Sequence, residues 1–272
     1  MSVSGSETLF AGSIPELYET RMVPMIFQPY AEDLARRVAD LSPARVLEIA
    51  AGTGVVTRAM AAVLPESVEL VATDLNQPML DRAISVGTRR PVRWQQADAM
   101  QLPFGDAGFD LVVCQFGAMF FPDKAHAFSE FRRVLRPGGT LLFNVWDRVE
   151  ENEFAEVIVK TLAGLYPADP PRFLERVPHG YFREDVIARD LAGGGFDAAP
   201  RFETLAARSR AASPDIPAMA YCQGTPVRNE IEARSGIDLA GVTDACTEAM
   251  AARFGPGPVE GKIQAHIVTV RR

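Results

Sequence analysis

The run VLEIAAGTG at residues 46–54 constrains the fold of this 272-residue chain more than any other segment. Its first four residues are mostly apolar and β-favouring, as a buried parallel strand requires. Alanine and glycine then remove side-chain bulk where the backbone turns and a ligand can approach. Helical spacing over Val55–Leu64 follows, so the free N–H groups of a helix N-terminus point toward whatever lies over the loop. The run predicts a cradle for a nucleotide-like cofactor, and it does not by itself decide which one.

Strand and helix patterns alternate with short turns from Val46 to Asp147. The predicted strands are Val46–Ile49, Val68–Thr73, Val92–Gln96, Leu111–Cys114 and Thr140–Val145. The predicted helices are Val55–Leu64, Pro78–Val86 and Lys124–Leu135, with Asn76 as the N-cap of the second. Regular alternation with continuous apolar strands implies a parallel sheet that helices cover on both faces.

The flanking segments carry further helical and strand patterns. Helical spacing covers Ile14–Leu41 before the core. After the core we predict helices over Glu150–Leu165, Phe182–Leu191 and Val242–Phe254, and late strands over Phe202–Arg208 and Ile263–Val270. The stretch Glu150–Pro178, which is proline-rich after Leu165, interrupts the alternation of strands and helices, and this favours a lid or an insertion there.

Composition excludes several classes of function. The net charge of -7 and the pI near 5.1 argue against nucleic acid as the main partner. Three cysteines and three histidines are scattered without metal-ligand spacing, so we expect no metal site and no disulfide framework. The first residues lack the pattern of a signal peptide, and no apolar run approaches the roughly 18 residues that span a bilayer. We therefore expect a cytoplasmic protein with a small-molecule partner, and the oligomeric state stays open.

Carboxylates follow two of the predicted strands at informative positions. Asp74 ends the second strand, 20 residues after Gly54, where a carboxylate can accept hydrogen bonds from both hydroxyls of a ribose. Asp98 ends the third strand and can accept a hydrogen bond from an adenine amino group. The fourth strand delivers Gln115 and Phe116 to the crevice where open α/β sheets bind ligands. Together these residues predict a dinucleotide or adenosine site.

Five ordered segments resemble the class I S-adenosylmethionine-dependent methyltransferases, especially the small-molecule branch that includes the ubiquinone/menaquinone-biosynthesis type. The segments are VLEIAAGTGVVT, ATDLNQPML, QADAMQLPF, FDLVVCQFGAMFFPD and LRPGGTLLFNVW. They cover roughly the middle 100 residues, in the order of the family. The resemblance implies an α/β fold with a Rossmann-like, seven-stranded, mostly parallel sheet, one strand of which is antiparallel and which the late strands complete.

The patterns along the chain predict a domain organisation, and the resemblance implies a role for individual residues. We expect an N-terminal helical lid segment at 1–41, an S-adenosylmethionine-binding core at 42–148, a lid insertion at 149–180 and a C-terminal part at 181–272 that completes the sheet. Glu48 would lie beneath the glycine loop and organise the methionine end of the cofactor, and Asp74 would bind the ribose. The other cofactor residues implied are Ala50, Gly52 and Gly54 at the methionine end, Leu75 and Met79 around the adenine, Asp98 and Ala99 at its edge, and Gln115 and Phe116 near the sulfonium. Ala50 departs from the family, which often has glycine there, and we expect a local adjustment.

Aromatic and methionine side chains near both ends of the core predict the acceptor pocket. The candidates are Tyr18, Arg21 and Phe27 in the N-terminal segment, Met119 and Phe120 after the fourth strand, and Trp146 at the end of the fifth. Packing onto the core explains the N-terminal residues equally well. This lining favours a partly apolar, partly aromatic methyl acceptor over a highly charged one.

The implied reaction is in-line transfer of the sulfonium methyl group to a small molecule, with S-adenosylhomocysteine as the product. Positioning supplies much of such a reaction, so we nominate no catalytic residue. His126 and His179 are possible bases, but a surface histidine and a turn residue are the favoured interpretations. Two alternatives remain open from the residues: an NAD(P)-dependent oxidoreductase, and a non-catalytic cofactor-binding protein on the same fold.

Overall fold

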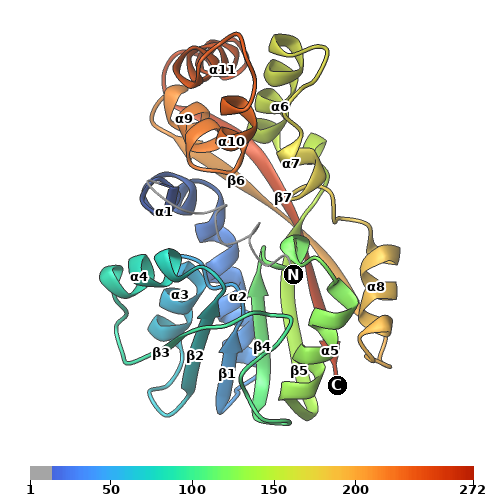
Figure 1. Ribbon diagram of the computed structural model, residues 1–272. Coiled ribbons are helices and arrows are strands. Elements are labelled where there is room, and N and C mark those ends of the chain that lie inside the picture. The colour runs from blue at the N-terminus through green and yellow to red at the C-terminus, as the bar shows by residue number, and fades with distance from the viewer. Residues whose placement is uncertain (1–13) are drawn as a thin grey trace. The chain divides into compact units, whose positions relative to one another are not determined.

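Seven strands form one sheet in the order β3-β2-β1-β4-β5-β7-β6 (Figure 1). Their bounds are β1 Arg45–Glu48, β2 Glu69–Asp74, β3 Arg93–Gln96, β4 Phe109–Gln115, β5 Leu135–Trp146, β6 Arg201–Ala211 and β7 Val259–Arg271. The first five strands pair in parallel, and β7 runs antiparallel to β5. This topology confirms the predicted Rossmann-like sheet and its antiparallel strand.

The computed structural model describes residues 14–272, which divide into two compact units. Unit 2 holds residues 28–146, 181–205 and 265–272, and unit 1 holds the described residues 14–27 together with 147–180 and 206–264. The core that was expected to bind the cofactor thus lies almost wholly in unit 2. The four-part division expected from the sequence stays a prediction.

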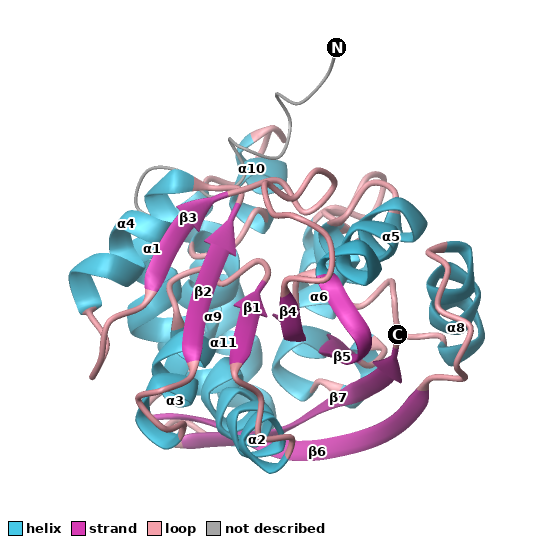
Figure 2. Ribbon diagram, turned by 90° about the horizontal axis from the view of Figure 1, so that it is seen from below, coloured by secondary structure: helices cyan, strands magenta, loops and turns pink. Residues whose placement is uncertain are grey.

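Helices cover both faces of the strands in unit 2. They are α2 Gln28–Asp40, α3 Val55–Val63, α4 Gln77–Val86, α5 Lys124–Val134 and α8 Glu184–Gly193. Helix α2 packs against α3 and α5 packs against α8. Figure 2 shows α2 and α3 on one side of the strands and α5 on the other. The two helical layers enclose apolar strand residues such as Leu47, Val112 and Phe143, which are all fully buried.

The sequence places the core elements to within a few residues. Strand β1 begins and ends one residue before its predicted bounds, and α3 ends one residue early. Asn76 is the N-cap residue of α4, as predicted, but its side chain makes no capping hydrogen bond. That side chain instead donates from Nδ2 to Asp74 Oδ1 at 3.3 Å. The amide is therefore used to hold a site residue rather than the helix.

The N-terminal segment is helical, as its spacing predicts, but its helix changes type along its length. The chain forms α1 Ile14–Leu17, then a π-helical segment Tyr18–Phe27, then α2. Pro24 lies inside the π-helical segment. Proline has no N–H to donate and its ring clashes with the preceding turn, so it disrupts regular i→i−4 bonding.

Unit 1 is mainly helical. It holds α1, the π-helical segment, a 3₁₀ turn Val149–Glu151, α6 Glu153–Leu165, α7 Phe173–Arg176, α9 Asp215–Gln223, α10 Val227–Glu232 and α11 Leu239–Phe254. Helix α11 packs against α9 and α6. In the part of the chain that the structure describes, no helix is long and apolar enough to cross a membrane.

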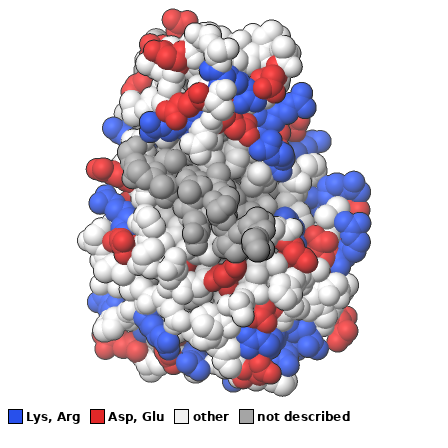
Figure 3. Space-filling model, in the orientation of Figure 1, with Lys and Arg blue, Asp and Glu red and all other residues white. Residues whose placement is uncertain are grey.

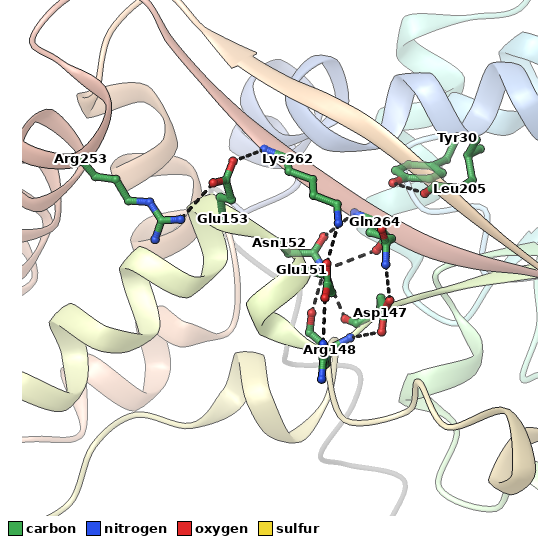
Figure 4. A network of polar contacts seen from close by, with 10 residues as sticks. All are labelled: Tyr30, Asp147, Arg148, Glu151, Asn152, Glu153, Leu205, Arg253, Lys262 and Gln264. Carbon is green, nitrogen blue, oxygen red and sulfur yellow. Dashed lines mark hydrogen bonds and ion pairs between the residues drawn. The ribbon is translucent and has the colours of Figure 1, made fainter.

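A polar network in unit 1 joins the start of α6 to β7 (Figure 4). Gln264 Nε2 donates to Asp147 Oδ2 at 2.6 Å, and the Gln264 backbone N–H donates to Asn152 Oδ1 at 3.1 Å. The Glu153 carboxylate accepts from the Lys262 backbone N–H at 2.5 Å. Asp147 and Asn152 are buried, so these bonds satisfy polar groups that would otherwise be costly to desolvate.

Candidate functional site: the glycine loop and its carboxylates

The glycine loop between β1 and α3 is fixed by backbone bonds to both neighbouring strands. Ile49 N–H donates to Val113 O of β4 at 2.8 Å, and Ala51 N–H donates to Thr73 O of β2 at 2.9 Å. The backbone takes positive φ at Ala50 (54°), Gly52 (55°) and Gly54 (84°). The loop therefore holds a tight, preformed turn at the N-terminus of α3, as the sequence predicts.

The two glycines are required for different reasons. A Cβ atom at Gly54 would lie 2.8 Å from Trp94 Cη2 and 3.1 Å from Ala83 Cβ, so packing excludes a side chain there. A Cβ atom at Gly52 would meet only the Met79 methyl group, at 3.6 Å. Gly52 is therefore needed for its backbone conformation, and Met79 lies against the loop, where it was predicted to line the cofactor site.

Asp74 fastens the glycine loop to the end of β2. Its Oδ2 accepts from the Gly52 backbone N–H at 2.8 Å, and its Oδ1 accepts from the Asn76 backbone N–H at 2.8 Å. The side chain is buried, which raises its pKa. Each carboxylate oxygen has two acceptor positions, and Oδ1 also accepts from Asn76 Nδ2 at 3.3 Å, so Oδ2 keeps capacity for a further donor. Asp74 thus shapes the loop and also presents an acceptor beside it.

Glu48 lies at the end of β1 and is 2% exposed. Thr57 Oγ1, from the first turns of α3, donates to Glu48 Oε2 at 2.5 Å. Burial raises the pKa of Glu48 to about 8, with the Asp74 charge adding to the rise and Thr57 and Arg58 opposing it. The side chain is therefore mostly protonated at neutral pH until a cation or a donor approaches it.

The predicted adenine-edge residues form a turn after β3. Met100 N–H donates to Asp98 Oδ1 at 2.8 Å, and Ala97 N–H donates to Asp74 O at 3.0 Å. Gln96 Nε2 donates to Leu75 O at 2.8 Å. These bonds hold the segments that carry Asp98, Ala99 and Leu75 next to the end of β2.

The backbone after β4, like the glycine loop, contains a non-glycine residue with a positive φ angle. Phe116 has a φ of 50°, and its backbone N–H donates to Asn144 Oδ1 at 2.9 Å. Asn144 is fully buried on β5 and lies opposite Gln115 in the sheet. Non-glycine residues at positive φ are uncommon and cluster at functional sites. Ala50 and Phe116 place two such residues after the neighbouring strands β1 and β4.

Three aromatic rings pack together at the ends of β4 and β5. Phe116 stacks on Trp146 with ring centroids 3.8 Å apart and an interplanar angle of 5°. Tyr30 of α2 meets both rings edge-on, at 5.3 Å from each. Its hydroxyl donates to Leu205 O at 3.2 Å (Figure 4). The cluster places Phe116, a predicted cofactor residue, in direct contact with Trp146, a predicted pocket residue.

The remaining predicted pocket residues divide between the units. Met119 is buried and Phe120 is 36% exposed in the short 3₁₀ helix Ala118–Phe120 of unit 2. Tyr18 and Phe27 belong to unit 1 and stack with their centroids 4.9 Å apart. Arg21 is exposed on the same π-helical segment. Their joint role as a pocket stays a prediction.

The surroundings of His126 and His179, the two histidines considered as bases, do not favour a role as a general base. His126 is exposed on α5, where its backbone N–H donates to the N-cap residue Asp123. His179 belongs to unit 1 and is buried with Nδ1 2.8 Å from Asp147 O, and burial lowers its pKa to about 4. Among residues 14–272 no group of three or more histidine, cysteine or acidic side chains is arranged to hold a metal ion.

The sequence reasoning missed four residues that build the site. Thr57 bonds Glu48, Asn144 holds Phe116, and Gly117 makes room for Ala50 and Cys114. The fourth is Thr53, whose hydroxyl is buried in the glycine loop without a hydrogen-bond partner among the described residues. The sequence did contain a signal for Thr53, because it carries a hydroxyl group and lies between the two loop glycines.

The contact between Ala50 and Gly117 gives the first test. A Cβ atom at Gly117 would lie 2.6 Å from Ala50 Cβ and 2.7 Å from Cys114 Sγ. Gly117→Ala should therefore lower the free energy of unfolding by about 1–3 kcal/mol through overpacking. Ala50→Gly should leave it unchanged or raise it by up to about 1 kcal/mol, because relief at positive φ outweighs the added unfolded-state entropy.

Urea unfolding of the two single variants and the double variant measures the coupling. In the double variant Ala50→Gly/Gly117→Ala the Cβ atom at residue 117 no longer meets a Cβ atom at residue 50. Its free energy of unfolding should therefore be higher, by at least about 0.5 kcal/mol, than the value obtained by adding the effects of the two single variants. Strictly additive effects would show that the two Cβ positions do not compete.

Residues 47–143 match the methyltransferase domain family. The chain is 43% identical over 102 residues to the ubiquinone/menaquinone biosynthesis C-methyltransferase UbiE of Ectopseudomonas mendocina, covering 36% of this chain and 40% of the relative. It is 32% identical over 166 residues to the UbiE protein of Azotobacter vinelandii, covering 56% of this chain and 66% of the relative. The chain thus spans less than two thirds of the length of these curated relatives.

Solved structures show the same fold. A Haemonchus contortus phospholethanolamine N-methyltransferase 2, solved with phosphomonomethylethanolamine and S-adenosylhomocysteine, superposes with a TM-score of 0.57 at 16% identity. The superposition covers 95% of this chain and 57% of that one. The matched family and relatives are methyltransferases, and they give no support to a nicotinamide-dependent oxidoreductase or a non-catalytic binding protein. The α/β core of this chain thus matches a methyltransferase domain family over residues 47–143, and the curated relatives that it resembles there are methyltransferases by name.

Proposed function

We propose that this chain transfers a methyl group from S-adenosylmethionine to a small-molecule acceptor. The observation that carries the proposal is the preformed glycine loop, with Asp74 bonded to Gly52 on one side and the buried Glu48 behind it. The methyltransferase family match over residues 47–143 supports the choice of cofactor. The curated relatives act in ubiquinone and menaquinone biosynthesis by name, which supports a small molecule as the acceptor.

The residues around the loop fit such a cofactor. The orphaned Thr53 hydroxyl lies at the start of α3, where free backbone N–H groups favour an anionic group such as a carboxylate. Glu48 can become the acceptor for an ammonium group, because a nearby cation favours its ionised form. Asp74 Oδ2 keeps acceptor capacity for a ribose hydroxyl, and Met79, which lies against the glycine loop, is proposed to contact the adenine. Asp98, Ala99, Leu75, Gln115 and Phe116 are proposed to complete the binding site.

The chemistry demands little of the protein beyond placement. The sulfonium supplies an activated methyl group whose transfer leaves a neutral thioether. The protein has to hold donor and acceptor in line and exclude water, which accounts for up to roughly 7–11 kcal/mol in well-oriented reactions. Phe116, fixed by Asn144 and stacked on Trp146, provides a rigid apolar wall for that task. No side chain in this arrangement is assigned as a general base.

The acceptor we propose is partly apolar and partly aromatic. Phe116, Trp146 and Tyr30 form a rigid aromatic cluster at the ends of β4 and β5, and Met119 is buried in the turn that follows Phe116. Acidic and basic side chains are interspersed over the described surface drawn in Figure 3, and the chain carries a net charge of -7. Neither feature favours a polyanionic acceptor such as nucleic acid.

Transfer of labelled methyl groups from S-adenosylmethionine to an acceptor panel tests the proposal. The panel should contain hydroquinones, simple phenols, small amines and a highly charged phosphate ester. We expect turnover with at least one aromatic acceptor and little with the phosphate ester. Preference for the charged acceptor would contradict the proposed acceptor class, and binding without turnover across a broad panel would favour a non-catalytic protein.

The Thr53 hydroxyl gives a sharper test of cofactor binding. Thr53→Val keeps the shape of the side chain and removes a buried hydroxyl that has no partner among the described residues, so stability should be unchanged or higher by up to about 1 kcal/mol. Affinity for S-adenosylhomocysteine should fall roughly 2- to 12-fold, which corresponds to about 0.5–1.5 kcal/mol. Calorimetric titration measures the affinity.

Thr57→Val is the contrasting variant, because its hydroxyl already bonds Glu48. It should lower stability, since a buried carboxyl loses its partner. If Thr53→Val destabilised the free protein and left the affinity unchanged, the proposed role of the Thr53 hydroxyl would be excluded.

A further inference from the structure

A second cavity lies at the amino ends of β2 and β3, away from the glycine loop. It has a volume of about 630 Å³ and is lined by Glu66, Ser67, Val68, Glu69, Leu70, Arg89, Arg90, Pro91, Val92 and Arg93. This volume falls within the range of small-molecule sites, about 300–1,000 Å³. Strand β2 begins at the cavity with Glu69 and ends with Asp74, so roughly 16 Å of strand separates the cavity from the loop. The cavity is therefore independent of the proposed cofactor site.

Arg90 makes this cavity unusual. Its side chain is 9% exposed, and its Nη1 donates to the backbone carbonyls of Val68 at 2.7 Å and Glu66 at 3.2 Å. Its Nε and Nη2 are buried and have no hydrogen-bond partner among the described residues. A guanidinium offers five donors in a planar fork, and buried donors are nearly always satisfied. The fork is thus held from one side by carbonyls and keeps two nitrogens without an acceptor.

The charge around Arg90 is not neutralised by the protein. Within residues 14–272 no carboxylate lies within ion-pair distance of Arg89, Arg90 or Arg93. Glu69 does line the cavity, but it pairs with Arg45, whose Nε is 2.8 Å from Glu69 Oε2. Among the described residues, the Arg93 side chain contacts neutral groups: its Nη2 donates to Gln95 Oε1 at 2.8 Å, and its guanidinium lies 5.9 Å from the centroid of the Phe104 ring. The lining of the cavity thus contains three arginines and, besides Glu69, which pairs with Arg45, one carboxylate, that of Glu66.

We propose that this cavity is a binding site for a small oxyanion of the phosphate or carboxylate type. A guanidinium fork matches the geometry of such groups in a bidentate manner, and a small shift of the Arg90 side chain would bring its buried, unpaired Nε and Nη2 donors within reach of an oxyanion in the cavity. Arg90 is the buried anchor, and Arg89 and Arg93 supply the surrounding positive charge. A bound anion would stabilise the folded chain by an amount that grows with the logarithm of the anion concentration once that concentration exceeds the Kd.

Titration of the full chain with inorganic phosphate and, separately, with citrate tests the site. Calorimetry gives the affinity and thermal unfolding gives the stabilisation, with sodium chloride at matched ionic strength as the reference. Arg90→Met removes the fork directly, but it also removes the tether to Val68 and Glu66 and can impair folding. The double variant Arg89→Gln/Arg93→Gln changes only exposed arginines of the cavity and carries the test. Arg172→Gln/Arg271→Gln makes the same change of charge at exposed positions elsewhere.

We expect saturable binding of at least one of the two anions by the unaltered chain. The affinity should fall at least tenfold in Arg89→Gln/Arg93→Gln and stay unchanged in Arg172→Gln/Arg271→Gln. Binding of phosphate alone would assign the site to phosphate groups, and binding of citrate alone to carboxylates. Absence of saturable binding would mean that the cavity holds water only. Equal weakening in both double variants would mean a general ionic effect, and either result overturns the proposal.

Discussion

Replacing Asp74 by alanine should weaken the binding of S-adenosylhomocysteine roughly 10- to 150-fold, which corresponds to about 1.5–3 kcal/mol. Two effects combine in this variant. The acceptor proposed for a ribose hydroxyl disappears, and the Gly52 and Asn76 backbone N–H groups lose their partner. The second effect loosens the glycine loop, so the free energy of unfolding should also fall, by about 1–3 kcal/mol. Calorimetry and urea unfolding measure the two quantities separately.

Two further variants make the Asp74 result interpretable. Asp74→Asn keeps one carbonyl oxygen, so it should retain more of the stability than of the affinity. Asp81→Ala removes an exposed carboxylate from α4 that bonds only Gln77, at 2.7 Å, in the described part of the chain, and it should change neither quantity appreciably. A folded Asp74→Ala protein with unchanged affinity would exclude Asp74 from the cofactor site.

Glu48→Gln should change how stability depends on pH. The folded-state pKa of Glu48 is about 8 and its ordinary value is 4.5, so the folded chain binds more protons than the unfolded chain between these values. Stability from this group is therefore present below about pH 4.5 and is lost as the pH rises toward 8. The loss amounts to on the order of 5 kcal/mol, taking about 1.36 kcal/mol for each unit of pKa shift.

The glutamine variant does not ionise, and its amide oxygen can still accept from Thr57. Its stability relative to the unaltered chain should therefore rise steadily between pH 4.5 and pH 8. Other groups, including His179 with its lowered pKa, contribute equally to both proteins and cancel in the difference. A difference in free energy of unfolding that does not change with pH would show that Glu48 is ionised in the folded chain.

Much of the core could be predicted because the residue types that favour its strands, turns and helices locally are also the types that packing into the sheet requires. Strand β1 is apolar and buried, and the glycines follow where the backbone turns to positive φ. A parallel strand, a tight turn and a helix N-terminus each favour particular residue types over a few neighbouring positions. That is why β1, the loop and α3 were placed to within one residue.

Contacts between distant segments could not be predicted in the same way. The bond from Thr57 to Glu48 depends on how α3 lies over β1, and the bond from Phe116 to Asn144 depends on the register of β4 with β5. The strain at Ala50 is likewise visible only in the backbone: the sequence suggested a small adjustment, whereas the residue keeps a φ of 54° beside Gly117. These contacts depend on how helices and strands that are distant in the sequence pack against one another, and local sequence patterns do not determine that packing.

Calorimetric titration with S-adenosylhomocysteine and with NAD, under the same conditions, tests the proposed cofactor most directly. Asp74, Thr53 and Glu48 around a preformed glycine loop predict saturable binding of S-adenosylhomocysteine at one site, with no detectable binding of NAD. Tight binding of NAD without binding of S-adenosylhomocysteine would contradict the assignment.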